Sequence, residues 1–180
     1  MVGTHKLRIS SKSFFQVNTE GAEALVDLVL EMLDPGAEDQ VVDAFAGVGL
    51  FTLPLAERAA RVFAVERHPA AVRDLRFHAE KAKTSIHVIA TNMDEAFEQL
   101  PKRVDGVVAD PPREGLGEAL CDGLARLQPQ RIVLVACDPA SLGRDVRALV
   151  DRGFVLERVV GVDLFPHTYH VEAVALLRAD

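Results

Sequence analysis

Apolar and polar positions along the chain change their spacing in a regular way. From residue 19 to residue 33, apolar side chains recur every three or four positions, which predicts an amphipathic helix with Thr19 as its N-cap. After Pro35 and Gly36, short apolar runs alternate with longer helical patterns. The predicted strands are 40–45, 61–66, 86–91, 104–110, 130–136, 154–163 and 169–178. The predicted helices between them are 50–59, 69–83, 93–99, 115–127 and 140–151.

This alternation predicts an α/β fold, with a Rossmann-like, mostly parallel seven-stranded sheet and helices on both faces. The last two strands follow each other with no helix between them, so we expect the last strand to be antiparallel. The 180 residues fit one domain overall. Within it, residues 1–40 are expected to form an N-terminal extension and first helix packed on a core of residues 41–180. Residues 5–10 and 13–18 have extended patterns that favour a short hairpin.

The net charge, the apolar runs and the cysteine count exclude some classes of protein. A net charge of −7 argues against this domain alone holding a nucleic-acid backbone, so an RNA substrate would need a local basic patch or a region outside the chain. No apolar run is long enough to span a bilayer and no signal peptide opens the sequence, so we expect no membrane partner. Two cysteines, Cys121 and Cys137, suggest no disulfide framework, which favours a cytoplasmic protein.

The pattern over residues 41–51 predicts a buried strand that ends in a tight turn and opens a helix. Gly47 and Gly49 carry no Cβ, so the backbone can turn sharply there and approach a ligand closely. About twenty residues later a second strand ends at Glu66, where a carboxylate can accept both hydroxyls of a ribose. These features predict a nucleoside-cofactor site at the switch point of the sheet.

The residues around this turn favour one cofactor over another. Thr52 stands where a dinucleotide fold has its third glycine, and Asp43 would repel phosphate and attract a cation. S-adenosylmethionine carries a sulfonium, an ammonium and an adenosine, but no phosphate. The turn is similar to the first motif of the class I S-adenosylmethionine-dependent methyltransferases. We therefore predict S-adenosylmethionine rather than NAD.

Two further residues stand where predicted strands end. Asp110 follows the fourth strand, and two prolines behind it stiffen the loop at the edge of the predicted cleft. Cys137 closes the fifth strand just before a helix, whose N-terminus favours the thiolate, whereas Asp138 beside it opposes that effect. The direction of the pKa shift of this thiol stays open. Cys121 lies inside a predicted helix and is expected to be structural.

Residues 163–172 form the densest polar cluster of the sequence. His167, His170 and Glu172 could suggest a metal site, but the histidines are three apart in a proline-bearing turn and no further ligand is evident. We predict no metal. A general base at the start of the last strand is the better hypothesis, although alternation does not decide whether Glu172 or His170 faces the cleft.

Six motifs in order resemble those of the RNA (uracil-5-)-methyltransferase family, the 5-methyluridine enzymes of tRNA and ribosomal RNA, and they span nearly the whole chain. They are FFQVN (14–18), DAFAGVGLFTLPLA (43–56), VFAVE (62–66), ADPPREG (109–115), ACDPASLGRD (136–145) and VDLFPHTYHVE (162–172). The resemblance implies a class I methyltransferase fold, with Cys137 as nucleophile and Glu172 as base. It also implies cofactor contacts at Gln16, Phe45, Glu66, Asn92 and Asp110.

The family chemistry is a thiolate addition to C6 of uracil, which activates C5 toward the methyl group of S-adenosylmethionine. The sequence departs from the family pattern around the nucleophile, at Leu134, Ala136, Asp138 and Ser141, and in the glycine turn, at Leu50. Family members also carry an RNA-binding β-barrel and a middle domain. We therefore expect a catalytic domain whose RNA-binding region lies outside this chain, or a minimal form.

Three alternatives remain at this point. A methyltransferase acting on another nucleophile would leave Cys137 idle. A cofactor-binding domain that needs a partner would bind S-adenosylmethionine without transferring its methyl group. An NAD-linked enzyme is the most distant alternative, because it conflicts with the residues of the glycine turn.

Overall fold

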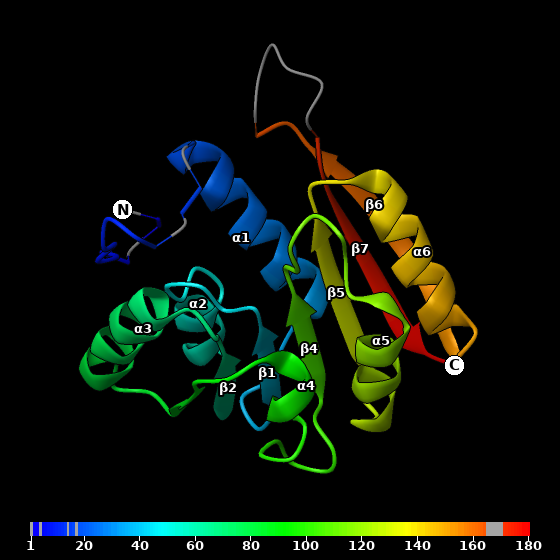
Figure 1. Cartoon of the computed structure of the whole chain (residues 1–180), viewed down its shortest axis with the longest axis horizontal. Coiled ribbons are helices and arrows are strands. Elements are labelled where there is room, and N and C mark those ends of the chain that lie inside the picture. The colour runs from blue at the N-terminus through cyan, green and yellow to red at the C-terminus, as the bar shows by residue number, and fades with distance from the viewer. Residues whose placement is uncertain (1, 4, 14, 17, 165–170) are drawn as a thin grey trace.

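The computed structural model of this chain describes residues 2–3, 5–13, 15–16, 18–164 and 171–180 (Figure 1). Strands and helices alternate along it much as the hydrophobic pattern predicts. The strands are β1 (Gln40–Ala44), β2 (Arg61–Val65), β3 (Ile86–Ile89), β4 (Gly106–Ala109), β5 (Arg131–Ala136), β6 (Phe154–Val162) and β7 (Glu172–Ala179). The helices are α1 (Thr19–Leu33), α2 (Thr52–Ala56), α3 (Pro69–Lys81), α4 (Met93–Ala96), α5 (Gly117–Arg126) and α6 (Pro139–Val150).

The strands form one seven-stranded sheet in the order β3-β2-β1-β4-β5-β7-β6. Strands β1 to β5 pair in parallel, and β7 lies antiparallel between β5 and β6. This confirms the predicted mostly parallel sheet with an antiparallel last strand. The connections reverse at β1, because β2 lies on one side of it and β4 on the other, and ligands of such sheets bind outside the carboxyl ends of the strands at that point.

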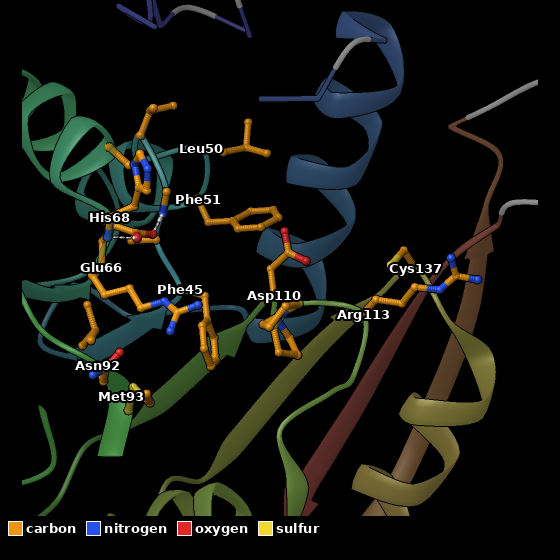
Figure 2. Close-up of a pocket in the computed structure, with 18 of the residues that line it drawn as sticks. Phe45, Leu50, Phe51, Glu66, His68, Asn92, Met93, Asp110, Arg113 and Cys137 are labelled. Carbon is orange, nitrogen blue, oxygen red and sulfur yellow. Dashed lines mark hydrogen bonds between the residues drawn. The ribbon is translucent and has the colours of Figure 1, made fainter. Parts of the chain in front are cut away.

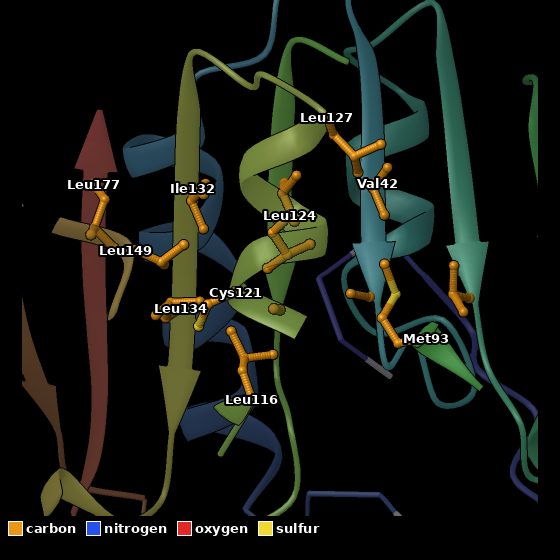
Figure 3. Close-up of a cluster of buried hydrophobic side chains, with 14 of the residues drawn as sticks. Val42, Met93, Leu116, Cys121, Leu124, Leu127, Ile132, Leu134, Leu149 and Leu177 are labelled. Carbon is orange, nitrogen blue, oxygen red and sulfur yellow. The ribbon is translucent and has the colours of Figure 1, made fainter. Parts of the chain in front are cut away.

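Helices cover both faces of the sheet, and alternation along each strand assigns its side chains to one face or the other. Val42 and Ile132 belong to the core beneath α4, α5 and α6, which Figure 3 shows, while Val41 and Val133 belong to the core beneath α1 and α2. The central strands β1 and β4 are buried almost throughout, as expected of parallel strands covered on both faces.

Helix α1 packs across β4, β5 and β7 and was predicted with its observed length. Its N-cap was predicted wrongly as Thr19. The side chain of Asn18 instead accepts a hydrogen bond from Gly21 N–H at 3.0 Å, and its amide group donates to the carbonyl of Leu164 at 3.2 Å. At the other end of α1, Asp34 has a φ of 45°, and Arg131 donates to the last carbonyl groups. The proposed division of the chain at residue 40 stays a prediction.

Helix α2 is shorter than predicted, since it covers five residues rather than 50–59. The glycine turn continues through Phe51 before helical geometry begins, and the helix already ends at Glu57. Pro54 is tolerated because the first turn of a helix needs no N–H donors. Residues 50 and 51, which the sequence pattern assigned to the helix, therefore belong to the turn.

The predicted hairpin near the N-terminus is wrong over the described residues. Val2 and His5 form an isolated bridge, and Ser13 N–H closes a turn on the carbonyl of Ser10. Residues 8–13 instead lie against α3, where side chains rather than a second strand satisfy their backbone groups. Across the described ranges, we find no helix with the length and apolar character needed to cross a membrane.

Candidate active site

A cavity of about 830 Å³ opens at the carboxyl ends of the parallel strands (Figure 2). Residues that directly follow these strands line it, and Glu172, the first residue of the antiparallel β7, reaches the same edge. The predicted site residues in its wall are Gln16, Phe45, Gly47, Glu66, Asn92, Asp110, Cys137 and Glu172. Of the predicted site residues, Gly49 does not line the cavity.

The glycine turn and Glu66 are already joined in this structure. One carboxylate oxygen of Glu66 accepts the Gly47 N–H at 2.8 Å, and the other accepts the His68 N–H at 2.7 Å. Phe45 and Gly47 have φ values of 65° and 56°, so the backbone enters the left-handed region at both positions. These bonds hold the carboxylate of Glu66 at the cavity wall, and they also occupy an N–H group that a phosphate would otherwise need.

Gly49 shapes the turn from outside the cavity. Its φ is 101°, a conformation that side chains rarely adopt, and a Cβ there would lie 3.0 Å from a methyl carbon of Leu75. The predicted need for glycine at this position therefore comes from backbone geometry and from packing against α3. The glycine at position 49 is therefore not explained by contact with a ligand.

Asp43 does not reach the cavity, contrary to the prediction that its charge would attract a cation there. Its side chain is fully buried, and Thr52 Oγ1 donates to its Oδ2 at 2.5 Å. Its Oδ1 finds no hydrogen-bond partner within the part of the chain that the structure describes. Burial raises the pKa of Asp43 to about 7, against the opposing effect of the Thr52 bond.

Replacing Thr52 with valine should therefore destabilise the protein. Valine keeps the shape of threonine but removes the hydrogen-bond donor of Asp43, at an expected cost of about 1–3 kcal/mol in the free energy of unfolding. The cost should grow as the pH rises above 7, because the bond stabilises the ionised form of Asp43. Urea unfolding at pH 6 and pH 8 measures both effects, and an equal cost at the two pH values would contradict this role of Thr52.

Asp110 leaves β4 at the cavity edge, followed by Pro111 and Pro112 as predicted. Burial raises its pKa to about 8, and the negative charges of Glu172 and Asp43 add to the shift. Burial also raises the pKa of Glu172, whose side chain is almost fully enclosed. The cavity wall thus holds two carboxyl groups whose pKa values are raised, and a positive charge placed beside them would lower both.

Cys137 follows β5 directly, and α6 begins two residues later with Asp138 as its N-cap. The side chain of Asp138 accepts the Ser141 N–H at 2.8 Å. The pKa of the Cys137 thiol is raised, first by burial and then by the negative charge of Glu172, while Arg113 opposes this. The open question from the sequence is thereby answered: the helix N-terminus does not outweigh burial and the neighbouring carboxyl groups.

The region of the predicted general base is only partly described. Glu172 is buried and lines the cavity, and the choice between it and His170 as the base stays a prediction. His167 and His170 lie outside the described residues. Among the residues that are described, no group of three or more histidine, cysteine or acidic side chains could hold a metal ion. Cys121 is buried in the core, in line with a structural role.

A family model described as tRNA (uracil-5-)-methyltransferase matches residues 4–180. The chain belongs to this family. An uncharacterized RNA methyltransferase of Streptococcus mutans is 39% identical over 173 residues, which are 94% of this chain and 38% of that protein. The 23S rRNA (uracil(1939)-C(5))-methyltransferase RlmD of Chromohalobacter salexigens is 41% identical over 169 residues, which are 93% of this chain and 35% of that protein.

Solved structures agree with this membership of the uracil-5-methyltransferase family. The Pyrococcus abyssi tRNA (uracil-54, C5)-methyltransferase in complex with S-adenosyl-L-homocysteine has a TM-score of 0.80 at 34% identity, covering 92% of this chain and 40% of that one. M. jannaschii TYW2 in complex with AdoMet, at 18% identity and a TM-score of 0.68, shares the fold alone. The methyltransferase fold is therefore confirmed, and the chain spans well under half the length of its family relatives.

The departures from the family motifs fall in places that the structure explains. Leu134 and Ala136 are buried in β5, and Asp138 and Ser141 form the cap of α6 through two hydrogen bonds. Leu50 lines the cavity, so this departure from the family pattern places an apolar side chain in the cavity wall. The substitutions next to Cys137 thus keep a well-formed strand end and helix start.

A buried acid that the sequence did not single out ties the two active-site loops together. Asp145 of α6 accepts the Leu116 N–H at 2.7 Å and the Gly117 N–H at 3.0 Å. Those amides end the loop that starts at Asp110, while α6 starts just after Cys137. A Cβ on Gly115 would lie 2.5 Å from the Asp145 carboxylate, which explains the glycine. Asp145 is the last residue of the motif ACDPASLGRD (136–145). Its position in that motif was the only indication in the sequence that it has a role.

Replacing Asp145 with alanine should loosen this loop. Two buried N–H groups would lose their acceptor, and we expect a loss of about 2–5 kcal/mol in the free energy of unfolding. Asp145→Asn retains one acceptor and should cost less. Denaturant unfolding of both variants measures the difference, and equal stability of Asp145→Ala and the unsubstituted protein would contradict the clamp.

Proposed function

We propose that this chain catalyses transfer of a methyl group from S-adenosylmethionine to C5 of a uridine in tRNA or ribosomal RNA. Cys137 would act as the nucleophile and Glu172 as the base. The observation that carries the proposal is that Cys137, Glu172 and Asp110 share one cavity with the Glu66 carboxylate. The residues proposed as nucleophile, base and ribose-binding acid therefore line one cavity at the switch point of the sheet.

The cavity fits a cationic nucleoside better than a dinucleotide. Its wall includes Glu66, Asp110 and Glu172, and the Gly47 N–H that a pyrophosphate would use is already bonded to Glu66. The raised pKa values of Asp110 and Glu172 identify a place where a positive charge is favoured. We therefore propose that Glu66 holds the ribose of the cofactor, while Gln16, Phe45, Asn92 and Asp110 surround the remainder.

S-adenosylmethionine would supply an electrophilic methyl group on a sulfonium. The work of this chain is to make C5 of uracil nucleophilic. The Cys137 sulfur forms a bond to C6, and the electron pair of the C5–C6 double bond moves toward the C4 carbonyl oxygen. Once C5 carries the methyl group, Glu172 accepts the C5 proton. The double bond then re-forms as the C6–S bond breaks, which restores the thiolate.

The thiol must lose its proton before it can add to C6. Burial and Glu172 raise the pKa of Cys137 in the ligand-free cavity, so addition is disfavoured there. A positive charge in the cavity would lower the pKa values of Cys137, Asp110 and Glu172 together. The site is thus expected to become reactive when the cofactor is bound. A cytoplasmic, reducing compartment is part of this proposal, since a thiol nucleophile must stay reduced.

The direct test is to incubate the full-length protein with tRNA and ribosomal RNA and with methyl-labelled S-adenosylmethionine. The RNA is then digested to nucleosides and analysed by mass spectrometry. We expect the label in 5-methyluridine. Label in another nucleoside, or in protein alone, would contradict the proposal and favour a different methyl acceptor.

Cofactor binding should depend on pH in a defined direction. The pKa of Asp110 is about 8 in the free protein and should fall beside a sulfonium, so binding near pH 7 releases a proton. Affinity for S-adenosylmethionine should therefore rise as the pH increases from 6 to 8, by up to about tenfold per pH unit, and then level off.

Calorimetry in two buffers of different ionisation enthalpy measures the released proton directly. The variant Asp110→Asn keeps the shape of the side chain and should release much less. An affinity that stays constant between pH 6 and pH 8 in the unsubstituted protein would contradict the assignment of Asp110 to the cation.

A further inference from the structure

The charge of this chain is unevenly distributed. Residues 5–13 and 67–83 hold eight lysine and arginine residues and two acids, a net charge of +6, although the whole chain carries −7. The eight cations are Lys6, Arg8, Lys12, Arg67, Arg73, Arg76, Lys81 and Lys83. All eight residues are exposed. We call this set the basic face.

The two segments of the basic face lie side by side (Figure 1). Asp74 of α3 is fully buried and accepts the Ser10 N–H at 2.7 Å and the hydroxyl groups of Ser10 and Ser13 at 2.8 and 2.9 Å. Arg8 and Lys81 both stand over the ring of Phe77, at 4.9 and 4.0 Å from its centroid. The N-terminal segment is thereby fixed on α3, and its cations join those of the helix in one surface.

The two ranges that form the basic face contain few acids of their own, and Glu57 lies beside the first of them, 3.6 Å from His5. Asp74 is buried and occupied by the N-terminal segment, which leaves Glu80 as the one exposed acid of the two ranges. Arg8 is the basic-face residue that forms an ion pair among the described residues, and its partner is Asp74. In the C-terminal half, by contrast, three arginines form ion pairs with surface carboxylates. They are Arg131, Arg152 and Arg178.

The basic face borders the active-site cavity. Lys12 and Arg67 belong to both, and Ala71 in the first turn of α3 also lines the cavity. Figure 2 shows Glu66 and His68 on one side of the cavity and Cys137 on the other, so an RNA strand held by the basic face would approach Cys137 from the Glu66 side. Arginine presents paired N–H donors that match phosphate oxygens.

We propose that the basic face binds the phosphate backbone of the RNA strand that carries the target uridine. The inference rests on the proposed function, because it takes the RNA substrate from there. The basic face gives this domain a positive surface for RNA, although the net charge of the chain is −7.

The test is the triple variant Arg73→Gln, Arg76→Gln and Lys83→Gln in the full-length protein. These side chains are exposed, form no hydrogen bond or ion pair within the described residues and do not line the cavity. The control variant Lys102→Gln, Arg103→Gln and Arg126→Gln removes the same charge from exposed positions outside the basic face. The probe is a fluorescein-labelled, uridine-containing single-stranded RNA, titrated across a series of salt concentrations.

We expect the basic-face variant to bind this RNA about 100-fold more weakly at ~0.1 M salt and to lose about 2 from the slope of log K against log salt. Affinity for S-adenosylmethionine should stay unchanged, and the control variant should bind RNA like the unsubstituted protein. Equal losses in both triple variants would overturn the proposal, as would an unchanged salt slope in the basic-face variant. Loss of binding to poly-glutamate but not to RNA would overturn it in favour of an acidic protein partner.

The proposal and the enzyme function can fail separately. RNA binding that depends on the basic face, without any methylated uridine, would leave the RNA surface standing and remove the proposed reaction. Normal methylation with unchanged KM for RNA in the basic-face variant would leave the reaction standing and overturn the RNA surface.

Discussion

Substituting Cys137 with alanine is expected to abolish uridine methylation, with a loss on the order of 10⁴-fold or more in kcat, as for removal of other covalent nucleophiles. Without the sulfur there is no group to add to C6, so C5 stays a poor nucleophile. The thiol is partly buried and its pKa is raised, so alanine removes a group that the folded protein holds in its neutral form. Stability and cofactor affinity should therefore change little.

The measurement for this substitution is single-turnover methyl transfer together with calorimetry for S-adenosylmethionine. Cys121→Ala provides a control, because that cysteine is buried in the core away from the cavity. It should lower stability while leaving methyl transfer per folded molecule intact. If Cys137→Ala retains activity, the methyl acceptor is not a uracil activated by this residue, and the alternative of another nucleophile gains support.

The second large effect is expected at Glu172. Glutamine has the shape of glutamate but cannot accept the C5 proton, so Glu172→Gln should still add to C6 and methylate C5. The methylated RNA would then stay bonded to Cys137, and turnover should fall by about 10²- to 10⁴-fold. Glu172 is buried and burial raises its pKa, which means that the folded protein disfavours its charge, so the uncharged amide of glutamine should be tolerated in the fold.

A covalent RNA–protein species that accumulates with ordinary uridine is the signature of this variant on a denaturing gel. Glu157→Gln is the control, because Glu157 lies exposed on β6 and pairs with Arg178 at the surface. It should turn over normally. Full turnover by Glu172→Gln, or loss of the first methyl transfer as well, would assign the proton to another group.

The sheet and the position of the site followed from the sequence because both depend on local pattern. Buried runs such as 40–44 and 106–109 carry the apolar residues of strands covered on both faces. The carboxyl ends of parallel strands meet at one edge, so Glu66, Asp110 and Cys137 had to lie near one another. Strand and helix limits moved by a few residues, and the largest error was α2, where the glycine turn runs on through Phe51.

The contacts that hold the site could not be predicted, because they join residues far apart in the chain. Asp74 reaches Ser10 across 64 positions, and Asp145 reaches Leu116 across 29. Neither acid differs in the sequence from a solvated residue on a helix. The fate of Asp43 was missed for a similar reason, since only the packed structure shows that Thr52 meets it away from the cavity.

The pKa shifts of the site residues could not be predicted from the sequence either. The sequence left the direction of the pKa shift of Cys137 open, because the following helix and Asp138 act in opposite directions, and in the structure burial and Glu172 raise this pKa. The raised pKa of Asp110 likewise comes first from burial and then from the charges of Glu172 and Asp43, which belong to two other strands. Both effects require the three-dimensional arrangement of several buried groups.

In the proposed reaction, Cys137 bonds to C6 of a uridine. The most direct measurement is to incubate the full-length protein with S-adenosylmethionine and RNA that contains 5-fluorouridine, and to locate any adduct by denaturing electrophoresis and peptide mass spectrometry. Fluorine cannot leave C5 as a proton does, so we expect a stable adduct on the peptide that contains Cys137. Methylation of uridine in ordinary RNA by the same preparation, with no adduct or with an adduct on another residue, would contradict it.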